Sequence, residues 1–348
     1  MSVDYIIVGQ GIAGTMLSYF LIKKGKNVIV IDKYDPASSS HVAGGAINPV
    51  TGKRLVKSWR IEELLPVAIK SYGELERLLE IKVFKPVTIK KYFINIEDRQ
   101  FYEEKMNDIE FQKWVQPIED DDSIFKKCSL GGVLIHNTFQ LDYSSLLNAF
   151  RKWLEKQDSI INERFDIEKI QINHRTVHYK DITADKIIFC EGYQASNNKY
   201  FDWLPFNLAK GEILTVKIPG IPEDSILKKG IFLLPLGNNL FKVGSTYNWD
   251  FKDGLPTEKG KEELISRLDK FLDLPYEVVG HKAAIRPTVK DRRPFIGMHP
   301  VHHSIGIFNG LGTKGASLAP FFANRFADCL INSGTLDKEV DVKRFYKN

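Results

Sequence analysis

The first thirty residues constrain the fold more than any other stretch of the chain. An apolar run at residues 3–8 is followed by Gly9, Gly11 and Gly14, at the spacing G-x-G-x-x-G. In parallel α/β folds the first glycine permits a tight turn, the second lets the backbone approach a pyrophosphate, and the third allows a helix to pack closely on a strand. The stretch therefore predicts a strand, a turn and a helix whose free N–H groups point at phosphates.

A carboxylate closes this first unit. A second apolar run at residues 28–31 ends in Asp32, with Lys33 beside it, and the periodic stretch at residues 12–24 is expected to be the intervening helix. A carboxylate at the end of the second strand is placed to bind ribose hydroxyls. Strand, glycines, helix and carboxylate in this order predict a dinucleotide site, and the alternative is a strand, turn and helix without a ligand.

Composition narrows the class of protein. A chain of 348 residues, 43% hydrophobic and 27% charged, is long enough for two domains with full cores. The net charge of +5 is spread along the chain, which favours a solvated basic surface over a nucleic-acid site. The three cysteines form no C-x-x-C motif, so we expect no metal site and no disulfide framework. We see no leader and no apolar run of membrane-spanning length, and therefore expect a cytoplasmic protein.

The remaining patterns predict an interleaved α/β fold. Residues 61–81 carry apolar positions three and four apart, including Ile69 and Leu78, and predict a helix with one buried face. Residues 160–172 are predicted as a strand, and short alternating runs elsewhere are typical of an antiparallel sheet. We therefore predict a nucleotide-binding domain and a substrate domain, made respectively of residues 1–82, 139–207 and 284–348, and of residues 83–138 and 208–283.

A second glycine-rich turn lies near the end of the chain. An apolar run at residues 305–309 leads into N-G-L-G-T-K-G and then into a helical pattern. Such a turn presents helix N–H groups and a positive dipole end to an anion, unless it is only an ordinary helix start. Paired with the first turn it favours a flavin, because the reduced flavin ring carries negative charge at its N1/O2 edge.

Motifs along nearly the whole chain resemble those of the D-amino acid oxidase and glycine oxidase superfamily of FAD-dependent amine oxidoreductases, to which sarcosine oxidases also belong. The resemblance implies a three-layer ββα, Rossmann-like FAD domain, an antiparallel α+β substrate domain over the flavin face, hydride transfer from an amine carbon to flavin N5, and reoxidation by oxygen. It rests on the first glycine turn, Gly44-Gly45-Ala46, Cys190-Glu191-Gly192, V-G-S-T, R-P-T-V-K-D-R-R-P-F-I-G and N-G-L-G-T-K-G-A-S-L-A-P.

The resemblance also implies which residues hold FAD. Asp32 stands where the family usually has Glu, and its shorter side chain still reaches a ribose. Gly192, at the end of a predicted strand, is expected to give the cofactor close access to the backbone. The expected cofactor-binding residues are Gly9, Gly11, Ile12, Ala13, Gly14, Asp32 and Lys33 at the ADP half, Ile167 at adenine, Ser39, Ser40, Gly45 and Ala46 along the flavin, Gly192, and Gly310, Gly312, Thr313, Lys314 and Gly315 at the pyrimidine edge.

Two basic residues are the candidates for catalysis and substrate binding. Arg286 stands where glycine oxidase-like members bind the substrate carboxylate, and Lys314 resembles a carboxylate-binding lysine of sarcosine oxidase-like members. The alternatives are a structural ion pair for Arg286 and a solvated lysine. Phe232 replaces the tyrosine that amino-acid oxidases use to help hold the carboxylate. Ile285 occupies the position of covalent flavin attachment, so we expect non-covalent FAD.

Three functions remain open at this stage. The first is an FAD-dependent oxidase or dehydrogenase acting on a small primary or secondary amine or amino acid. The second is an FAD-dependent tRNA enzyme that acts on a carboxymethylaminomethyl group of a wobble uridine, against which stands the absence of a concentrated basic, aromatic-rich stretch. The third is a protein in which FAD is only structural. The acceptor of the electrons, the amine and a homo-oligomeric state are not specified by the sequence.

Overall fold

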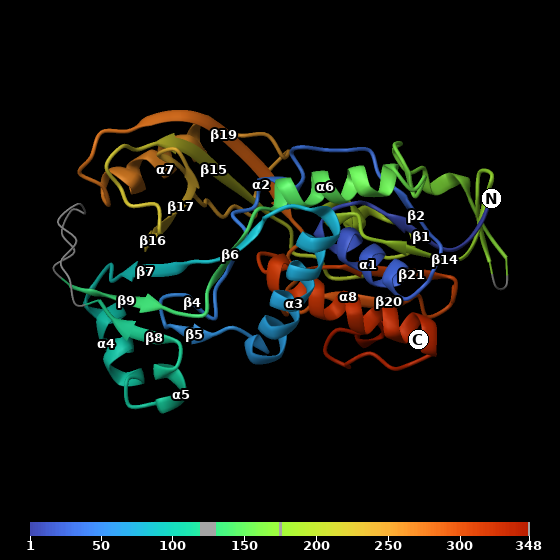
Figure 1. Cartoon of the computed structure of the whole chain (residues 1–348), viewed down its shortest axis with the longest axis horizontal. Helices are drawn as coiled ribbons and strands as arrows, with labels where there is room; N and C mark the ends of the chain where they lie inside the picture. Colours follow the sequence, from blue (N-terminus) through green and yellow to red (C-terminus); the bar gives the residue numbers. More distant parts are fainter. Residues whose placement is uncertain (119–129, 174–175, 347–348) are drawn as a thin grey trace.

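Two sheets organise the described residues, which are 1–118, 130–173 and 176–346 of this computed structural model. Figure 1 shows them as two lobes, with β1 and β14 in one, β15 and β19 in the other, and both chain termini at the first. Cys128 lies outside the described residues. No helix in the described part of the chain is long and apolar enough to cross a membrane.

The first sheet is the predicted nucleotide-binding sheet. Its order is β11-β2-β1-β14-β13-β12, with β21 also paired to β14 and β20 paired to β21. Strands β2, β1, β14 and β21 run parallel, whereas β13, β12 and β20 join antiparallel. Its strands are β1 (Ser2–Val8), β2 (Val28–Ile31), β11 (Ile160–Ile161), β12 (Ile170–Ile172), β13 (Val177–Tyr179), β14 (Ile182–Phe189), β20 (Phe295–Met298) and β21 (Ile305–Asn309).

The second sheet is mostly antiparallel, as expected for the substrate domain, with one parallel pair between β7 and β16. Its order is β19-β15-β18-β17-β16-β7-β9-β8. Its strands are β7 (Thr88–Tyr92), β8 (Val115–Pro117), β9 (Gly132–Ile135), β15 (Ala209–Lys217), β16 (Ser225–Lys229), β17 (Ile231–Gly237), β18 (Leu240–Gly244) and β19 (Glu277–Arg286).

Small strands join the two lobes. A short sheet orders β3, β10 and β6, and a two-stranded sheet pairs β4 with β5. Their bounds are β3 (Ala46–Ile47), β4 (Val50–Thr51), β5 (Val56–Lys57), β6 (Phe84–Pro86) and β10 (Phe139–Leu141). The predicted interleaving is visible in this strand order, while the domain boundaries stay a prediction.

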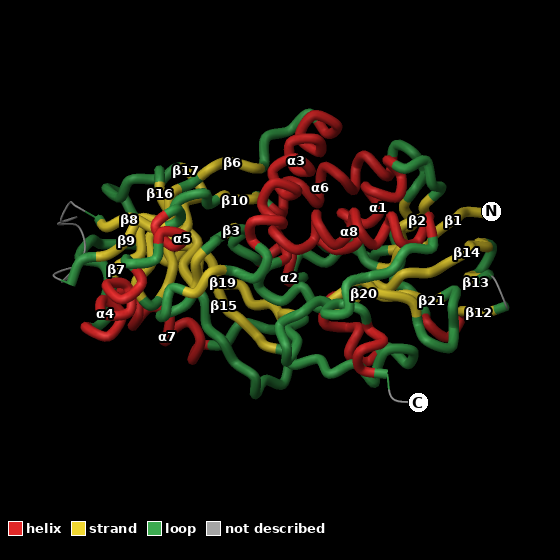
Figure 2. The backbone as a smooth tube through the Cα atoms, turned by 90° about the horizontal axis from the view of Figure 1, so that it is seen from below, coloured by secondary structure: helices red, strands yellow, loops and turns green. Residues whose placement is uncertain are grey.

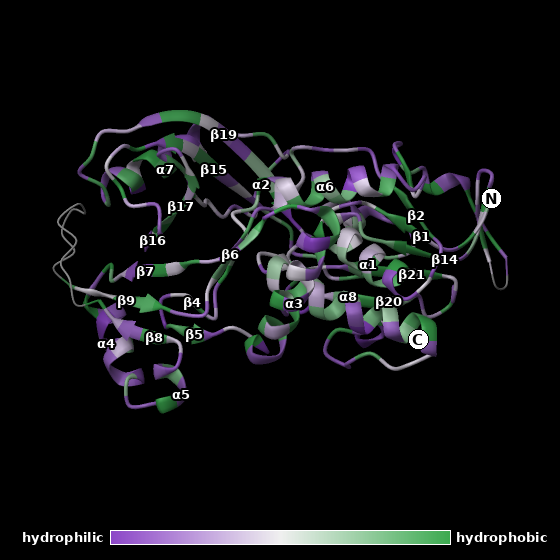
Figure 3. Ribbon diagram, viewed as in Figure 1, coloured by the Kyte–Doolittle hydropathy of each residue, from purple (hydrophilic) through white to green (hydrophobic). Residues whose placement is uncertain are grey.

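Helices cover one side of the first sheet. Figure 2 shows α1, α3, α6 and α8 grouped there, and burial of their apolar faces against the strands stabilises this lobe. Figure 3 shows β1, β2 and β14 as mainly hydrophobic and α4 as hydrophilic. The helices are α1 (Ile12–Lys23), α2 (Ser39–Val42), α3 (Ile61–Leu79), α4 (Ile96–Lys105), α5 (Ile109–Gln112), α6 (Tyr143–Glu155), α7 (Glu258–Asp269) and α8 (Gly315–Asn332), with 3-10 helices η1 (Ile167–Lys169), η2 (Gly192–Asn197) and η3 (Val342–Phe345).

Two sequence predictions need correction. Helix α3 ends at Leu79 rather than at residue 81. Two of its predicted core positions, Ile69 and Leu78, are 41% and 42% exposed, because they lie outside the helix face that packs against α8. The predicted strand at residues 160–172 is wrong: β11 and β12 are separated by η1. Strand β11 already ends at Ile161, and Asp166 then starts the 3-10 helix, because its side chain accepts a hydrogen bond from the Glu168 N–H and caps it.

Candidate cofactor and substrate site

The first glycine turn has the geometry that its spacing predicts. Gly9 has a φ of +97°, which favours glycine, and a Cβ at this position would lie 2.6 Å from the Cys190 carbonyl oxygen on β14. A Cβ at Gly14 would overlap the carbonyl oxygen of Gly9. The turn is therefore pressed against both its own helix and the neighbouring strand, which brings the start of α1 to the carboxyl end of the sheet.

A cavity of about 830 Å³ opens at that edge and continues between the lobes. Gly9, Gly11, Ile12 and Ala13 line it at the start of α1, and Gly14 packs behind them. The Ile12 N–H donates to Ser40 Oγ at 3.1 Å. Of the serines expected along the flavin, Ser40 thus lies at the phosphate end, where a free helix N–H would otherwise meet an anion.

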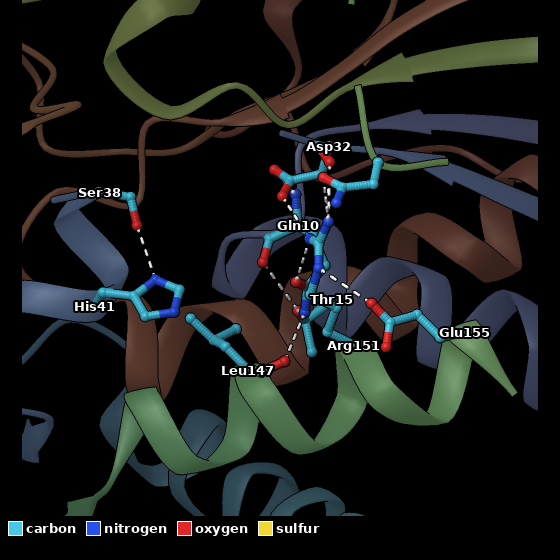
Figure 4. A network of polar contacts seen from close by, with 9 residues as sticks. Gln10, Thr15, Asp32, Ser38, His41, Leu147, Arg151 and Glu155 are labelled. Carbon is cyan, nitrogen blue, oxygen red and sulfur yellow. Dashed lines mark hydrogen bonds and ion pairs between the residues drawn. The ribbon is translucent and has the colours of Figure 1, made fainter. Parts of the chain in front are cut away.

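Asp32 lines the cavity at the end of β2, held by a network that Figure 4 shows. Its Oδ2 accepts from the Gln10 N–H at 2.9 Å, and its Oδ1 accepts from Arg151 Nη1 at 2.8 Å. Arg151 also donates to the Asp32 carbonyl oxygen at 3.1 Å and to Asn162 Oδ1 at 3.0 Å. The carboxylate is therefore fixed in orientation and keeps lone pairs free for ribose hydroxyls.

Arg151 is a residue that the sequence reasoning missed. It is 7% exposed and lies on the buried face of α6, among Leu147, Phe150 and Leu154. An arginine on the apolar stripe of a helix needs a buried partner, since an unpaired buried charge is costly. The position of Arg151 on the apolar stripe could have indicated a buried ion pair, but the sequence does not say which carboxylate would be its partner.

Ile167, expected at adenine, does not line the cavity. It lies in η1 rather than on a strand, and its side chain packs against the core of the first lobe. Glu163, Arg164 and Phe165 line the cavity in its place. The cause is the Asp166 cap, which turns the chain one residue before Ile167.

The small-residue loop lies along the middle of the cavity. Ser39, Ser40, Gly45 and Ala46 all line it, as does Lys33 nearer the first turn. The Leu141 N–H donates to the Gly45 carbonyl oxygen at 3.0 Å, and a Cβ at Gly45, whose φ is +79°, would overlap the Leu141 carbonyl oxygen. The loop is therefore held by backbone contacts that tolerate only glycine.

The second glycine-rich turn lies beside the first along the cavity, since a Cβ at Gly315 would be 3.1 Å from the Ile12 side chain at the start of α1. Gly312, Thr313, Lys314 and Gly315 line it, while Gly310 shapes the turn with a φ of +73° and does not line the cavity. Helix α8 starts at Gly315, so its N-terminal N–H groups face the cavity. Gly192 also lines the cavity, and its carbonyl oxygen accepts from Asn309 Nδ2 at 2.9 Å.

Arg286 faces the cavity from the end of β19. Its Nη2 donates to Ser245 Oγ at 2.9 Å, and its guanidinium lies over the Tyr247 ring, 4.9 Å from the centroid. A Cβ at Gly211 would overlap the guanidinium, so the missing side chain makes room for it. Within the described residues no carboxylate pairs with Arg286, and burial lowers its pKa. The structural ion pair considered as an alternative is therefore not formed.

Two lysines add positive charge to the same cavity. Lys314 donates to Ser58 Oγ at 3.1 Å, and burial, with Arg292 and Arg293 nearby, lowers its pKa. Lys228 on β16, which the sequence reasoning missed, also lines the cavity. Burial, with Lys91 beside it, lowers the pKa of Lys228 to about 8. Lys314 and Lys228 therefore add to the positive charge that Arg286 brings to the cavity.

A Rossmann-like sheet with two glycine turns at one cavity, and a second, mostly antiparallel sheet that also lines the cavity, is the arrangement expected of a dinucleotide-binding protein. The family model described as DAO, FAD dependent oxidoreductase, matches residues 4–329. The chain belongs to this family.

Individual relatives agree with that assignment. Glycine oxidase of Bacillus subtilis is 21% identical over 94% of this chain and 93% of its own. The crystal structure of glycine oxidase from Geobacillus kaustophilus superposes with a TM-score of 0.81 at 18% identity, covering 99% of this chain and 98% of the other. A tRNA 5-methylaminomethyl-2-thiouridine biosynthesis bifunctional protein of Leptospira borgpetersenii is 24% identical over 84% of this chain and 47% of its own.

FAD is expected from the family, and the cavity fits it. The first turn is a cradle in which an added Cβ would collide, with helix N–H groups at its rim. A second helix N-terminus, that of α8, lies next to the first, and a fixed carboxylate lies beside the first turn. These are the donors and acceptor that a pyrophosphate, a flavin edge and a ribose need.

Proposed function

We propose that this chain oxidises the C–N bond of a small primary or secondary amine that carries a carboxylate, with non-covalent FAD as cofactor and oxygen as electron acceptor. The observation that carries the proposal is Arg286, a cation that faces the cavity and has no carboxylate partner in the described chain. A buried, unpaired guanidinium is costly unless a ligand supplies the anion. A carboxylate provides it bidentately.

The residues that would hold the cofactor follow from the site. The start of α1 would hold the pyrophosphate, Asp32 the ribose, and the start of α8 the pyrimidine edge of the flavin. When bound, FAD supplies the hydride acceptor. Ile285, which has no nucleophilic side chain, at the position of covalent attachment supports dissociable FAD.

The remaining contribution of the protein is orientation and exclusion of water. Arg286 would fix the carboxylate end of the amine, and the apolar side chains of Ile213, Phe232 and Leu234, which line the cavity, would exclude water around the reacting carbon. Phe232 has no hydroxyl to offer the carboxylate, so Arg286 would carry that interaction without the usual phenolic partner. Lys314 would stabilise negative charge nearby.

The test is an anaerobic panel of amines with and without a carboxylate, followed through the visible absorbance of the bound flavin. We expect bleaching by a carboxylated amine, and a rise in KM of the order of a hundredfold in Arg286→Met, since a bond to a charged group is removed. Arg267→Met, which removes an exposed arginine paired with Glu263, is the matched control and should leave KM unchanged. Full kcat/KM in Arg286→Met would contradict the proposal.

A tRNA substrate is the second candidate, favoured by one surface feature. Tyr247 and Trp249 are 43% and 60% exposed, and their rings lie 4.6 Å apart beside Arg286. Exposed aromatic rings can stack on an unpaired base. A salt-sensitive gel shift with tRNA, lost in a Tyr247→Ala/Trp249→Ala double variant, would support this candidate.

Other outcomes bear on the remaining predictions. Bound flavin that no amine reduces would support a structural role for FAD. A cytoplasmic location and a homo-oligomeric state stay predictions, the second open to size-exclusion chromatography with light scattering.

A further inference from the structure

The cavity contains two separate cationic groups, and the sheet register says how far apart they are. Lys228 pairs with Phe232, Phe232 with Gly244, and Gly244 with Ile213, so these residues form one row across β16, β17, β18 and β15. Residues opposite one another in a sheet point to the same face. Lys228 therefore points to the same face of the sheet as Phe232 and Ile213, which also line the cavity.

Arg286 reaches the same face from the other end of the sheet. On β19, Lys282 is the strand partner of Ile213, and Arg286 lies an even number of residues further along. Because side chains along a strand alternate between the two faces of the sheet, the Arg286 side chain points to the same face as Ile213. Its guanidinium lies against Gly211, two residues from the row of Lys228. Three strand spacings separate β15 from β16, about 14 Å across the sheet, and two residues add about 7 Å along it.

A single carboxylate does not span this distance. Even a lysine fully extended toward the guanidinium would leave about 10 Å between the two cationic groups. Two charge-assisted bonds to one carboxylate bridge about 8 Å at most. The two cations are thus placed to bind different anionic groups.

Lys228 has no anionic partner within the described residues. No ion pair or hydrogen bond of its ammonium group is formed there, and the charged group that faces it, Lys91 in the paired position on β7, is also a cation. Lys91 itself donates to the Gly52 carbonyl oxygen at 3.0 Å. The acidic residues that line the cavity, Asp32, Asp35, Glu163 and Glu191, belong to segments of the first lobe around the nucleotide cradle.

We propose that Lys228 is a second anion-binding group and that the substrate is an amine with two anionic ends, one held by Arg286 and the other by Lys228. The inference rests on the proposed function, because Arg286 is taken to hold the carboxylate next to the reacting carbon. The second anion is a carboxylate at the far end of a chain a few atoms long. Oxidation would occur at the amine carbon between the two anchors.

The test compares ligands that differ only in the second charge. Calorimetry on the FAD-loaded protein measures binding of adipate against hexanoate, and anaerobic flavin reduction compares N-(3-carboxypropyl)glycine with N-butylglycine. We expect the member of each pair that carries two carboxylates to bind about tenfold or more tightly than the member with one, the gain typical of a bond between charged groups. Lys228→Met should remove most of this preference, and Lys217→Met, an exposed lysine on β15, should leave it intact.

A structural role for Lys228 predicts a different result. Removing an unpaired, half-buried charge should raise the melting temperature of the ligand-free protein, whereas removing a structural lysine should lower it. Equal binding of both members of each pair, or equal weakening of both by Lys228→Met, would overturn the proposal, since the second result means that Lys228 and Arg286 hold the same carboxylate. Tight tRNA binding lost in Lys228→Met would assign the second anion to a phosphate and would also overturn it.

Different results would show whether the proposed amine oxidation or the proposed role of Lys228 is wrong. If no amine in the panel reduces the flavin, the proposed function fails, even where calorimetry shows that the cavity prefers two charges. If amines reduce the flavin without regard to a second charge, the proposed function stands and only the inference on Lys228 fails.

Discussion

Arg151 on α6 donates a hydrogen bond of 2.8 Å to the carboxylate of Asp32 at the end of β2. This contact joins the first strand pair of the nucleotide-binding sheet to a helix that follows more than a hundred residues later. It orients Asp32 in the ligand-free protein, which would lower the entropic cost of binding a ribose there.

We expect Arg151→Met to weaken FAD binding about tenfold, because Asp32 loses a charge-assisted bond that orients it. The free energy of unfolding should fall by about 2 kcal/mol, less than for a fully buried pair because Asp32 keeps some contact with water. Flavin fluorescence titration and urea unfolding measure the two effects. Arg99→Met, which breaks the exposed pair with Glu103, is the control and should change stability by less than about 0.5 kcal/mol. Wild-type FAD affinity in Arg151→Met would refute the positioning role.

Gly14 and Gly73 are both helical glycines, yet we expect opposite effects from the same substitution. Gly14→Ala should destabilise the protein by about 3 kcal/mol and abolish tight FAD binding, because the added Cβ meets backbone at Gly9. Gly73→Ala should stabilise it by about 0.5–1 kcal/mol, since a Cβ there meets only the Arg77 guanidinium at 3.9 Å. Thermal melts of both variants test this, and a neutral effect of Gly14→Ala would show that the turn can shift.

Glu191 gives the ligand-free protein a pH-dependent stability. Burial raises the pKa of Glu191 to about 7. A hydrogen bond that Asn198 Nδ2 donates to its carboxylate at 2.8 Å lowers the pKa and offsets part of this effect. A raised pKa means that the folded state holds a proton that the unfolded chain has released, so this stability is full below the unfolded pKa and is lost as the pH rises through 7.

Urea unfolding at pH 5 and pH 8 should therefore show a loss of about 2 kcal/mol in the wild type that is absent in Glu191→Gln. Glu104→Gln, which changes an exposed carboxylate on α4, is the control and should keep the wild-type dependence. An identical pH dependence in Glu191→Gln would show that other groups cause it.

Binding of a dianion should also depend on pH. The pKa of Lys228 is lowered to about 8, with Lys91 as the charged group that faces it in the described chain, so Lys228 is cationic below pH 8 and neutral above it. We expect the Kd of adipate to rise as the pH passes from 7 to 9.5. Lys228→Arg should hold its charge and extend tight binding to the higher pH. A flat profile in the wild type would count against a role for Lys228.

The fold is predictable from the sequence because the signals that specify it are local. The glycine spacing at Gly9 to Gly14, the apolar strand before it and Asp32 after it lie within one unit, and the structure brings them together as expected. Cavity lining by Arg286 and Lys314 followed from motifs that the chain shares with its family. What FAD and a substrate do with these residues stays a prediction.

The errors and omissions are of a different kind. Strand β11 ends at Ile161, although periodicity alone predicts one strand to residue 172, and the Asp166 cap places Ile167 in a 3-10 helix outside the cavity. The contact of Arg151 with Asp32, and the placement of Lys228 on the same sheet face as Arg286, depend on packing and strand register between segments far apart in the chain, which no local pattern encodes. Apolar Ile69 and Leu78 were assigned to the core because spacing gives a helical face but not its width.

The order in which the strands enter the two sheets also limits how such a protein can be re-engineered. The chain leaves the first sheet for the second and returns, and then does so again, before it ends. A chimera with a new substrate specificity would therefore require two separate stretches from the same donor to be exchanged at once. A chimera made with a single crossover would contain neighbouring strands of one sheet that come from different parent proteins.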